Sequence, residues 1–70
     1  MPRIEHRNKI ARARNVFGKV INRAHYAGET TVLVNRGKED VAVIVPVEFY
    51  ERAKAALGEE VTPGEREDDA

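Results

Sequence analysis

The sequence predicts one small α+β domain followed by an acidic tail, from two patterns. Apolar residues recur with helical spacing over residues 7–27 and again over residues 47–57. Between them, residues 31–35 and 41–45 are β-rich runs separated by a polar tip, which is typical of a hairpin. A chain of 70 residues forms at most one domain, and about 60% burial of its unfolded surface leaves such a domain marginally stable. We therefore expect an oligomer.

The N-terminal part is predicted to form a short strand and then a helical region. Residues 2–6 read as an edge strand, because a proline is tolerated at the first position of such a strand. From Arg7 to about Ala27 the apolar residues follow the spacing of one helix face, and Gly28 ends the pattern. These apolar residues are Ile10, Ala13, Phe17, Val20, Ile21 and Ala24.

Arg14 does not fit an unbroken helix. It lies seven residues before Ile21, so its charge would point toward the core. Either a buried carboxylate neutralises it or the helix breaks near residues 14 and 15, since burying an unpaired guanidinium is prohibitive. Asn15, a good N-cap type, and Gly18, a poor helix former, favour a short helix, a kink and a longer helix. On a continuous helix the opposite face would carry a basic and polar stripe of Arg12, Asn15, Lys19 and Arg23, in which Lys19 and Arg23 are expected to be solvated.

The predicted hairpin has two apolar faces and a cationic tip. The run VAVIV, residues 41–45, is apolar on both faces, which indicates that the helix covers one face and a second subunit the other. Arg36 and Lys38 flank Gly37 at the tip, and Pro46 ends the second strand. Tip cations are also common simply because they keep a sheet edge soluble, so their function depends on the rest of the pattern.

The C-terminal part divides at Gly58. Residues 47–57 have helical spacing, with Val47, Tyr50 and Leu57 on one side, and Gly58 stops the helix. Residues 58–70 are acidic and contain one aliphatic side chain beyond alanine, so they cannot bury enough surface to fold alone. The expected organisation is a domain over residues 1–57 and a flexible tail over residues 58–70.

A net charge of zero conceals two oppositely charged halves. Residues 1–38 hold nine Lys or Arg and two acids, a balance of +7, whereas residues 39–70 hold three bases and ten acids, a balance of −7. Such segregation suggests that the front half meets a polyanion, although two solvated faces are the plainer alternative.

The composition excludes several classes of function. Cys, Ser, Gln and Trp are absent, so there is no disulfide and no Ser or Cys nucleophile, and two His residues are too few for a structural zinc site. No apolar run approaches the ~18 residues that a membrane span needs. We expect a cytoplasmic protein that uses no cofactor, meets no membrane and is not an enzyme.

Taken in order, these segments resemble the Phd/YefM antitoxin family of bacterial toxin–antitoxin modules. The family pattern is an A-R-x-x-L/F segment opening a helix, a helix ending in G-E, a strand leading to R-x-G, a second strand, and a helix with Tyr near its start. The match covers roughly residues 10–57 almost without gaps. Its counterparts here are Ala13, Arg14 and Phe17; Gly28 and Glu29; residues 32–34; Arg36, Gly37 and Lys38; residues 42–45; and Tyr50.

The resemblance implies a homodimer that binds the operator of its own operon in double-stranded DNA and represses it. The family's DNA-contacting arginines carry over to Arg14 and Arg36. Around them, the DNA-binding surface is expected to include Lys38, Arg12, Asn15 and Arg7. The resemblance also implies that the C-terminal part neutralises a cognate toxin, RelE-like or Doc-like, for which the candidate contacts are Phe49, Leu57 and Val61. The tail is shorter and less apolar than a typical toxin-wrapping segment.

Two alternatives stay open at this stage. One is an orphan Phd/YefM-like regulator without a toxin. The other is a protein-binding inhibitor or scaffold whose basic half contacts an acidic protein and never DNA. In that case Arg14 would be a structural ion-pair partner, and the cations at the tip would serve only solubility.

Overall fold

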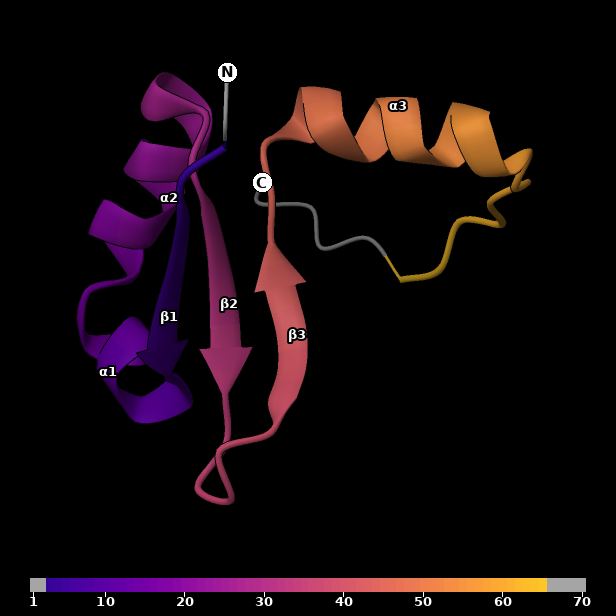
Figure 1. The fold of residues 1–70 in the computed structure, drawn as a ribbon. Coiled ribbons are helices and arrows are strands. Elements are labelled where there is room, and N and C mark those ends of the chain that lie inside the picture. The colour runs from indigo at the N-terminus through magenta and orange to yellow at the C-terminus, as the bar shows by residue number, and fades with distance from the viewer. Residues whose placement is uncertain (1–2, 66–70) are drawn as a thin grey trace.

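The computed structural model describes residues 3–65 and confirms a small α+β arrangement. In it, the three strands form one sheet in the order β1-β2-β3, with β1 parallel and β3 antiparallel to the central β2 (Figure 1). None of the helices within residues 3–65 has the length and apolarity to cross a membrane. The elements are β1 (Glu5–Lys9), α1 (Ile10–Asn15), α2 (Phe17–Ala27), β2 (Thr30–Val34), β3 (Asp40–Ile44) and α3 (Val47–Leu57).

The first strand extends further than predicted. Residues 7–9 were expected to open the helix, but they continue β1 and pair in parallel with β2, Arg7 opposite Val32 and Lys9 opposite Val34. Pro2, the expected start of the strand, lies outside the described residues. The physical reason is that parallel pairing with the central strand satisfies backbone groups that a first helical turn leaves without partners.

The predicted break in the helical region is confirmed, one residue later than expected. Val16, with φ −123° and ψ 34°, separates α1 from α2, and its N–H donates to the carbonyl oxygens of Arg12 and Ala13, each at 3.2 Å. Asn15 was expected to cap the second helix, which is wrong: it is the last residue of α1, and α2 begins without a side-chain cap. The break leaves Arg14 exposed.

The core between the helices and the sheet is small. Its buried apolar side chains within residues 3–65 are Ala13, Val20 and Ala24, and Val32 is buried on the other face of the sheet. Thr31 is also buried, with 1% of its surface exposed, and receives hydrogen bonds from Arg23 Nε at 3.0 Å and Nη2 at 2.8 Å. Arg23 also donates to Asn8 Oδ1. The prediction of a solvated Arg23 was therefore wrong, because its position beside Ala24 turns it toward the sheet.

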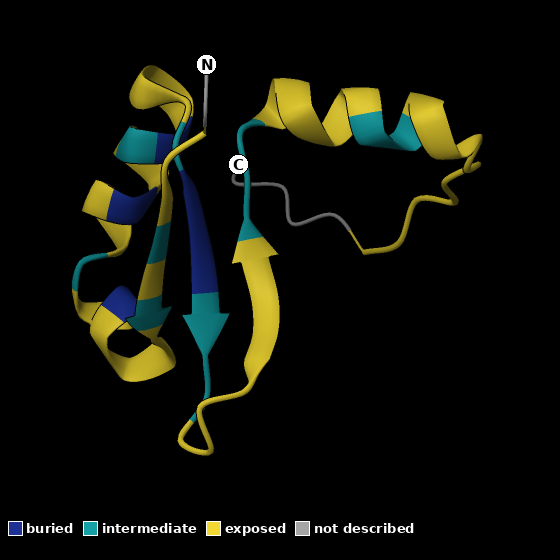
Figure 2. Cartoon of the chain, in the orientation of Figure 1, coloured by how far each residue is buried: buried dark blue, intermediate teal, exposed yellow. Residues whose placement is uncertain are grey.

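The two faces of the sheet differ in cover. Thr31 faces the helices, so Val32, its neighbour in the strand, points to the opposite, open face. Val43 pairs with Val32 and shares that open face, where 52% of its surface is exposed. Figure 2 shows nearly the whole of β3 as exposed, in contrast to β2. A single chain thus leaves β3 uncovered, and cover by a second subunit stays a prediction.

The last helix matches its predicted bounds and leaves the sheet. Gly58, at φ 67°, ends α3 in the left-handed conformation, and its N–H donates to the Ala55 carbonyl oxygen at 3.2 Å. None of the residues of α3 is buried, and the helix projects away from the end of β3 (Figure 1). Residues 59–65 are exposed and contain neither helix nor strand, whereas the rest of the predicted tail, 66–70, lies outside the described residues.

Candidate functional site

Several cations of the basic half, residues 1–38, lie at the end of the sheet where β1 and β2 finish. Because β1 and β2 are parallel, their carboxyl ends lie at the same edge. α1 begins directly after β1, and the hairpin tip, residues 35–39, begins directly after β2. Both segments therefore lie near one end of the molecule, as Figure 1 shows.

A cleft of roughly 540 Å³ lies between α1 and the hairpin tip, and we call it the cation cleft. Its charged members are Lys9, Arg14 and Arg36, and none of the acidic residues among 3–65 lines it. Within residues 3–65, none of these three cations takes part in an ion pair. The complete lining is Lys9, Ile10, Ala11, Arg14, Val34, Asn35 and Arg36.

This lining suits a ligand that is both anionic and partly apolar. Arg and Lys side chains form short, strong, charge-assisted hydrogen bonds with phosphate oxygens. Ile10, Ala11 and Val34 supply apolar surface beside the cations, of the kind that contacts sugars and thymine methyl groups in DNA complexes. Three cations around one concave surface also raise the local positive potential and attract polyanions.

The hairpin tip is held by its own hydrogen bonds. Asn35 N–H donates to the Glu39 carbonyl oxygen, and Lys38 N–H donates to the Asn35 carbonyl oxygen, each at 3.0 Å. Lys38 has φ 65°, a left-handed conformation that glycine usually supplies and that costs other residues about 1–2 kcal/mol. These hydrogen bonds fix the backbone that carries Arg36, and Lys38 adopts a conformation in which glycine would be less strained.

The structure brings together two of the predicted DNA-binding residues. Arg14, from α1, and Arg36, from the tip, both line the cation cleft. Arg12 and Asn15, on α1, and Lys38, at the tip, are exposed near the cleft but do not line it.

Arg7 does not join these residues. It lies in β1 on the open face of the sheet, where its guanidinium donates to both carboxylate oxygens of Asp40 and lies 3.6 Å from Glu5 Oε1. The hydrogen bond from Arg7 to Asp40, and then the charge of that carboxylate, raise the pKa of Arg7 above its ordinary value. Since β2 lies between β1 and β3, this ion pair spans the central strand. Its placement in the DNA-binding set is not supported by the structure.

Lys9 and Asn35 line the cleft but were missed by sequence reasoning. Lys9 was assigned to the middle of a helical turn, and Asn35 was treated as the end of a strand. The sequence did contain a signal for Lys9, because it is one of several closely spaced bases in the basic half of the chain, residues 1–38. Nothing local distinguished Asn35 from an ordinary turn residue.

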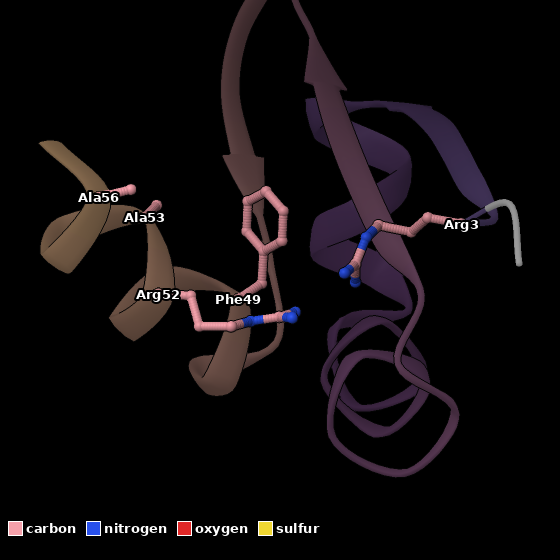
Figure 3. Close-up of a pocket in the computed structure, with 5 residues that line it drawn as sticks. All are labelled: Arg3, Phe49, Arg52, Ala53 and Ala56. Carbon is pink, nitrogen blue, oxygen red and sulfur yellow. The ribbon is translucent and has the colours of Figure 1, made fainter.

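A second hollow of roughly 340 Å³, the Phe49 groove, lies between α3 and the segment before β1. Figure 3 shows Arg3 and Arg52 pointing toward each other beside the ring of Phe49, and Arg3 Cζ lies 4.6 Å from the ring centroid. Ala53 and Ala56 complete its lining. Of the three predicted toxin contacts, only Phe49 lies here, and Leu57 and Val61 are 71% and 56% exposed elsewhere.

Neither a metal site among the described residues nor a similar known protein indicates the function. In the part of the chain that the structure describes, no group of three or more His, Asp or Glu side chains is placed to hold a metal ion. Comparisons with protein-family models, with curated proteins and with solved structures find no match for this chain. The argument for function therefore rests on the cation cleft and the surfaces around it.

Proposed function

We propose that the protein is a homodimeric DNA-binding antitoxin of the Phd/YefM type. It binds an operator, represses its own operon and neutralises a toxin through its C-terminal part. The cation cleft carries this proposal, because it joins Lys9, Arg14 and Arg36 at one end of the sheet, and no acid of the described residues lines it. Phosphate contacts from such cations supply most of the affinity of a protein for DNA.

The arrangement of charge along the molecule supports DNA as the polyanion. β3 starts at the hairpin tip and runs away from it, so α3 and the acidic segment after it follow the far end of the sheet. α3 and residues 59–65 are thus separated from the cation cleft by the length of a strand (Figure 1), whereas Glu39 and Asp40 lie at the hairpin tip and the start of β3. This separation lets the basic end approach DNA without repulsion from the acids of α3 and residues 59–65.

Exposed apolar surface supports a homodimer. Phe17 and Ile21 on the helices are 54% and 40% exposed, and Val43 on the open sheet face is 52% exposed. Large exposed apolar surfaces on a small domain are typical of subunit interfaces. A two-fold dimer would present two cation clefts, as proteins that bind two operator half-sites require.

The Phe49 groove supports a protein partner. It combines the aromatic ring of Phe49 with two cations, Arg3 and Arg52. Such a groove suits an acidic segment of another protein, which is the contact that a toxin would make. The same observation favours the second candidate function, a protein-binding inhibitor that does not bind DNA. An orphan regulator would bind DNA through the cation cleft and would bind no toxin in this groove.

Salt dependence of binding tests the proposal. Fluorescence anisotropy would measure the affinity for a duplex from upstream of the gene and for an unrelated duplex over a range of salt concentrations. Arg36→Ala and Lys38→Ala should each lower the slope of log affinity against log salt by about one if the side chain contacts a phosphate. Arg14→Ala should cost about 1–3 kcal/mol on the upstream duplex only, if it contacts a base.

Lys19→Ala is the matched control, because Lys19 is an exposed cation of α2 outside the cleft. It should leave both affinity and slope nearly unchanged. Circular dichroism would verify that each variant is folded. Salt-independent binding, or none, would exclude a DNA-binding function and favour the protein-binding inhibitor. An unfolded Arg14→Ala would instead make Arg14 a structural residue.

A further inference from the structure

Asn35 lines the cation cleft, and a hydrogen bond holds its side chain in one orientation. Its Oδ1 accepts a hydrogen bond from the Glu39 N–H at 3.0 Å, and its own N–H and carbonyl oxygen are both used within the hairpin tip. The residue is partly buried, unlike Arg36, which follows it. The carboxamide is thus anchored through its oxygen.

The anchored carboxamide offers donors to a ligand. An asparagine amide carries one acceptor oxygen and two N–H donors on Nδ2. Within residues 3–65, Nδ2 of Asn35 has no hydrogen-bond partner, whereas Oδ1 is engaged by Glu39. The usual bidentate contact of asparagine with adenine needs both the oxygen and the nitrogen. Asn35 is therefore suited to a ligand that presents acceptors.

We infer that Asn35 is a specificity-determining residue that donates from Nδ2 to an acceptor on a base edge, guanine O6 or N7 or thymine O4. Those atoms are the acceptors that guanine and thymine expose in the major groove, where cytosine exposes an amino donor. The assignment rests on the proposed DNA binding and extends it, because it names the class of base that the cleft selects.

The neighbours of Asn35 explain why its donors would meet a base and not a phosphate. Lys9, Arg14 and Arg36 already offer charged donors, which bind phosphate oxygens more strongly than a neutral amide does. Val34 and Ile10 add apolar surface to the lining of the same cleft. A donor left without an acceptor in such a place lowers affinity, and this penalty discriminates against the wrong base.

Asn35→Asp separates recognition from turn structure. Aspartate keeps an Oδ1 acceptor for the Glu39 N–H, so the hairpin tip should persist. It replaces the two Nδ2 donors by a second acceptor, which pairs with the amino group of cytosine. Binding selection from a random duplex library would be run with both proteins. The wild-type protein should enrich guanine or thymine at one position by about 5- to 150-fold, and the variant should lose this preference or prefer cytosine there.

The added negative charge needs its own control. Asn22→Asp introduces the same charge at an exposed position of α2 outside the cleft. It should weaken binding to all duplexes evenly and leave the selected base unchanged. Asn35→Asp should also melt at nearly the same temperature as the wild-type protein if the turn is intact.

A second measurement alters the DNA and leaves the protein unchanged. Where guanine is selected, 7-deazaguanine removes the N7 acceptor and 2-aminopurine lacks the O6 acceptor, and where thymine is selected, 4-thiothymine weakens the O4 acceptor. At least one analogue of the selected base should reduce wild-type affinity several-fold and leave that of Asn35→Asp nearly unchanged.

The outcomes distinguish the inference from the proposed function. If the wild-type protein shows no salt-dependent binding to any duplex, the DNA-binding function itself fails. If it binds DNA but Asn35→Asp enriches the same base to the same degree, Asn35 only stabilises the turn and the inference is overturned. Equal affinity of the wild-type protein for normal and analogue duplexes would overturn it as well, even if the variant failed to fold.

Discussion

Arg23 shows how one partly buried charged residue can join the elements of a small domain. It follows the buried Val20 on α2, and its guanidinium bridges two strands by donating to Thr31 on β2 and Asn8 on β1. The hydroxyl of Thr31 is almost completely buried, so it depends on this partner. Arg23 thereby ties the helix to the parallel strand pair.

Replacing this arginine should destabilise the protein. In Arg23→Ala the hydroxyl of Thr31 loses a partner, which should lower the free energy of unfolding by about 1–3 kcal/mol. Urea unfolding followed by circular dichroism would measure it. The double variant Arg23→Ala with Thr31→Val removes both polar groups and should recover part of the loss. Equal loss in both variants would show that packing of the arginine stem, not the hydrogen bonds, is what matters.

The ion pair of Arg7 and Asp40 has a different role at the residue scale. Both side chains are about half exposed, so solvent and salt screen their attraction. The raised pKa of Arg7 means that its charge contributes to stability below the ordinary arginine pKa, and that the contribution is lost only as pH rises through the raised value. Within the pH range of ordinary experiments, Arg7 therefore stays charged.

At the scale of elements, the start of α2 offers a test of local propensity. Gly18 lies in the first turn of this helix, and a Cβ added there would meet no atom within 4 Å. Gly18→Ala should raise the free energy of unfolding by about 0.4–1 kcal/mol, because alanine restricts the unfolded chain and favours the helix. Denaturant unfolding with an unchanged m-value would show it.

Gly28 is the matched control for that substitution. It ends α2 at φ 69°, where alanine would be strained whatever the space around it. Gly28→Ala should therefore destabilise the protein by about 1–2 kcal/mol. A loss of similar size from both substitutions would contradict the open surroundings of Gly18 and indicate that another chain packs against it.

At the scale of the whole molecule, the decisive property is the exposed apolar surface. A core limited to a few small aliphatic side chains supplies little stability to a 70-residue chain. The exposed face of the sheet is therefore available for binding a second subunit. Dimerisation would then add to stability by mass action, so the melting temperature should rise with protein concentration.

Val43→Glu tests the open sheet face as a subunit interface. Because Val43 is half exposed in the single chain, the substitution should cost little within a monomer but bury a charge in a dimer. Analytical ultracentrifugation at micromolar concentration should show a dimer for the wild-type protein and mainly monomer for the variant. Val61→Glu, at a similarly exposed position of the tail, should remain dimeric. A folded wild-type monomer under these conditions would refute the proposed homodimer.

The sequence by itself determined the elements whose patterns are local. The hairpin, α3 and its end at Gly58 follow from alternation, helical spacing and a glycine in the left-handed region. The position of Arg14 on an apolar stripe indicated the break before α2. Arg14 and Arg36, the two predicted DNA-contacting arginines, both line the cation cleft. The division of charge between the two halves is likewise a property of the chain alone.

The tertiary structure alone decided what depends on partners distant in the chain. Pairing with β2 drew residues 7–9 into a strand, placed Lys9 in the cation cleft and left Arg7 with Asp40 on the open face. The hydrogen bond from the Glu39 N–H oriented Asn35, and contact with Thr31 held the partly buried Arg23 against the sheet. The physical reason is that periodicity records which residues share a face, whereas pairing between segments more than twenty residues apart decides what that face meets.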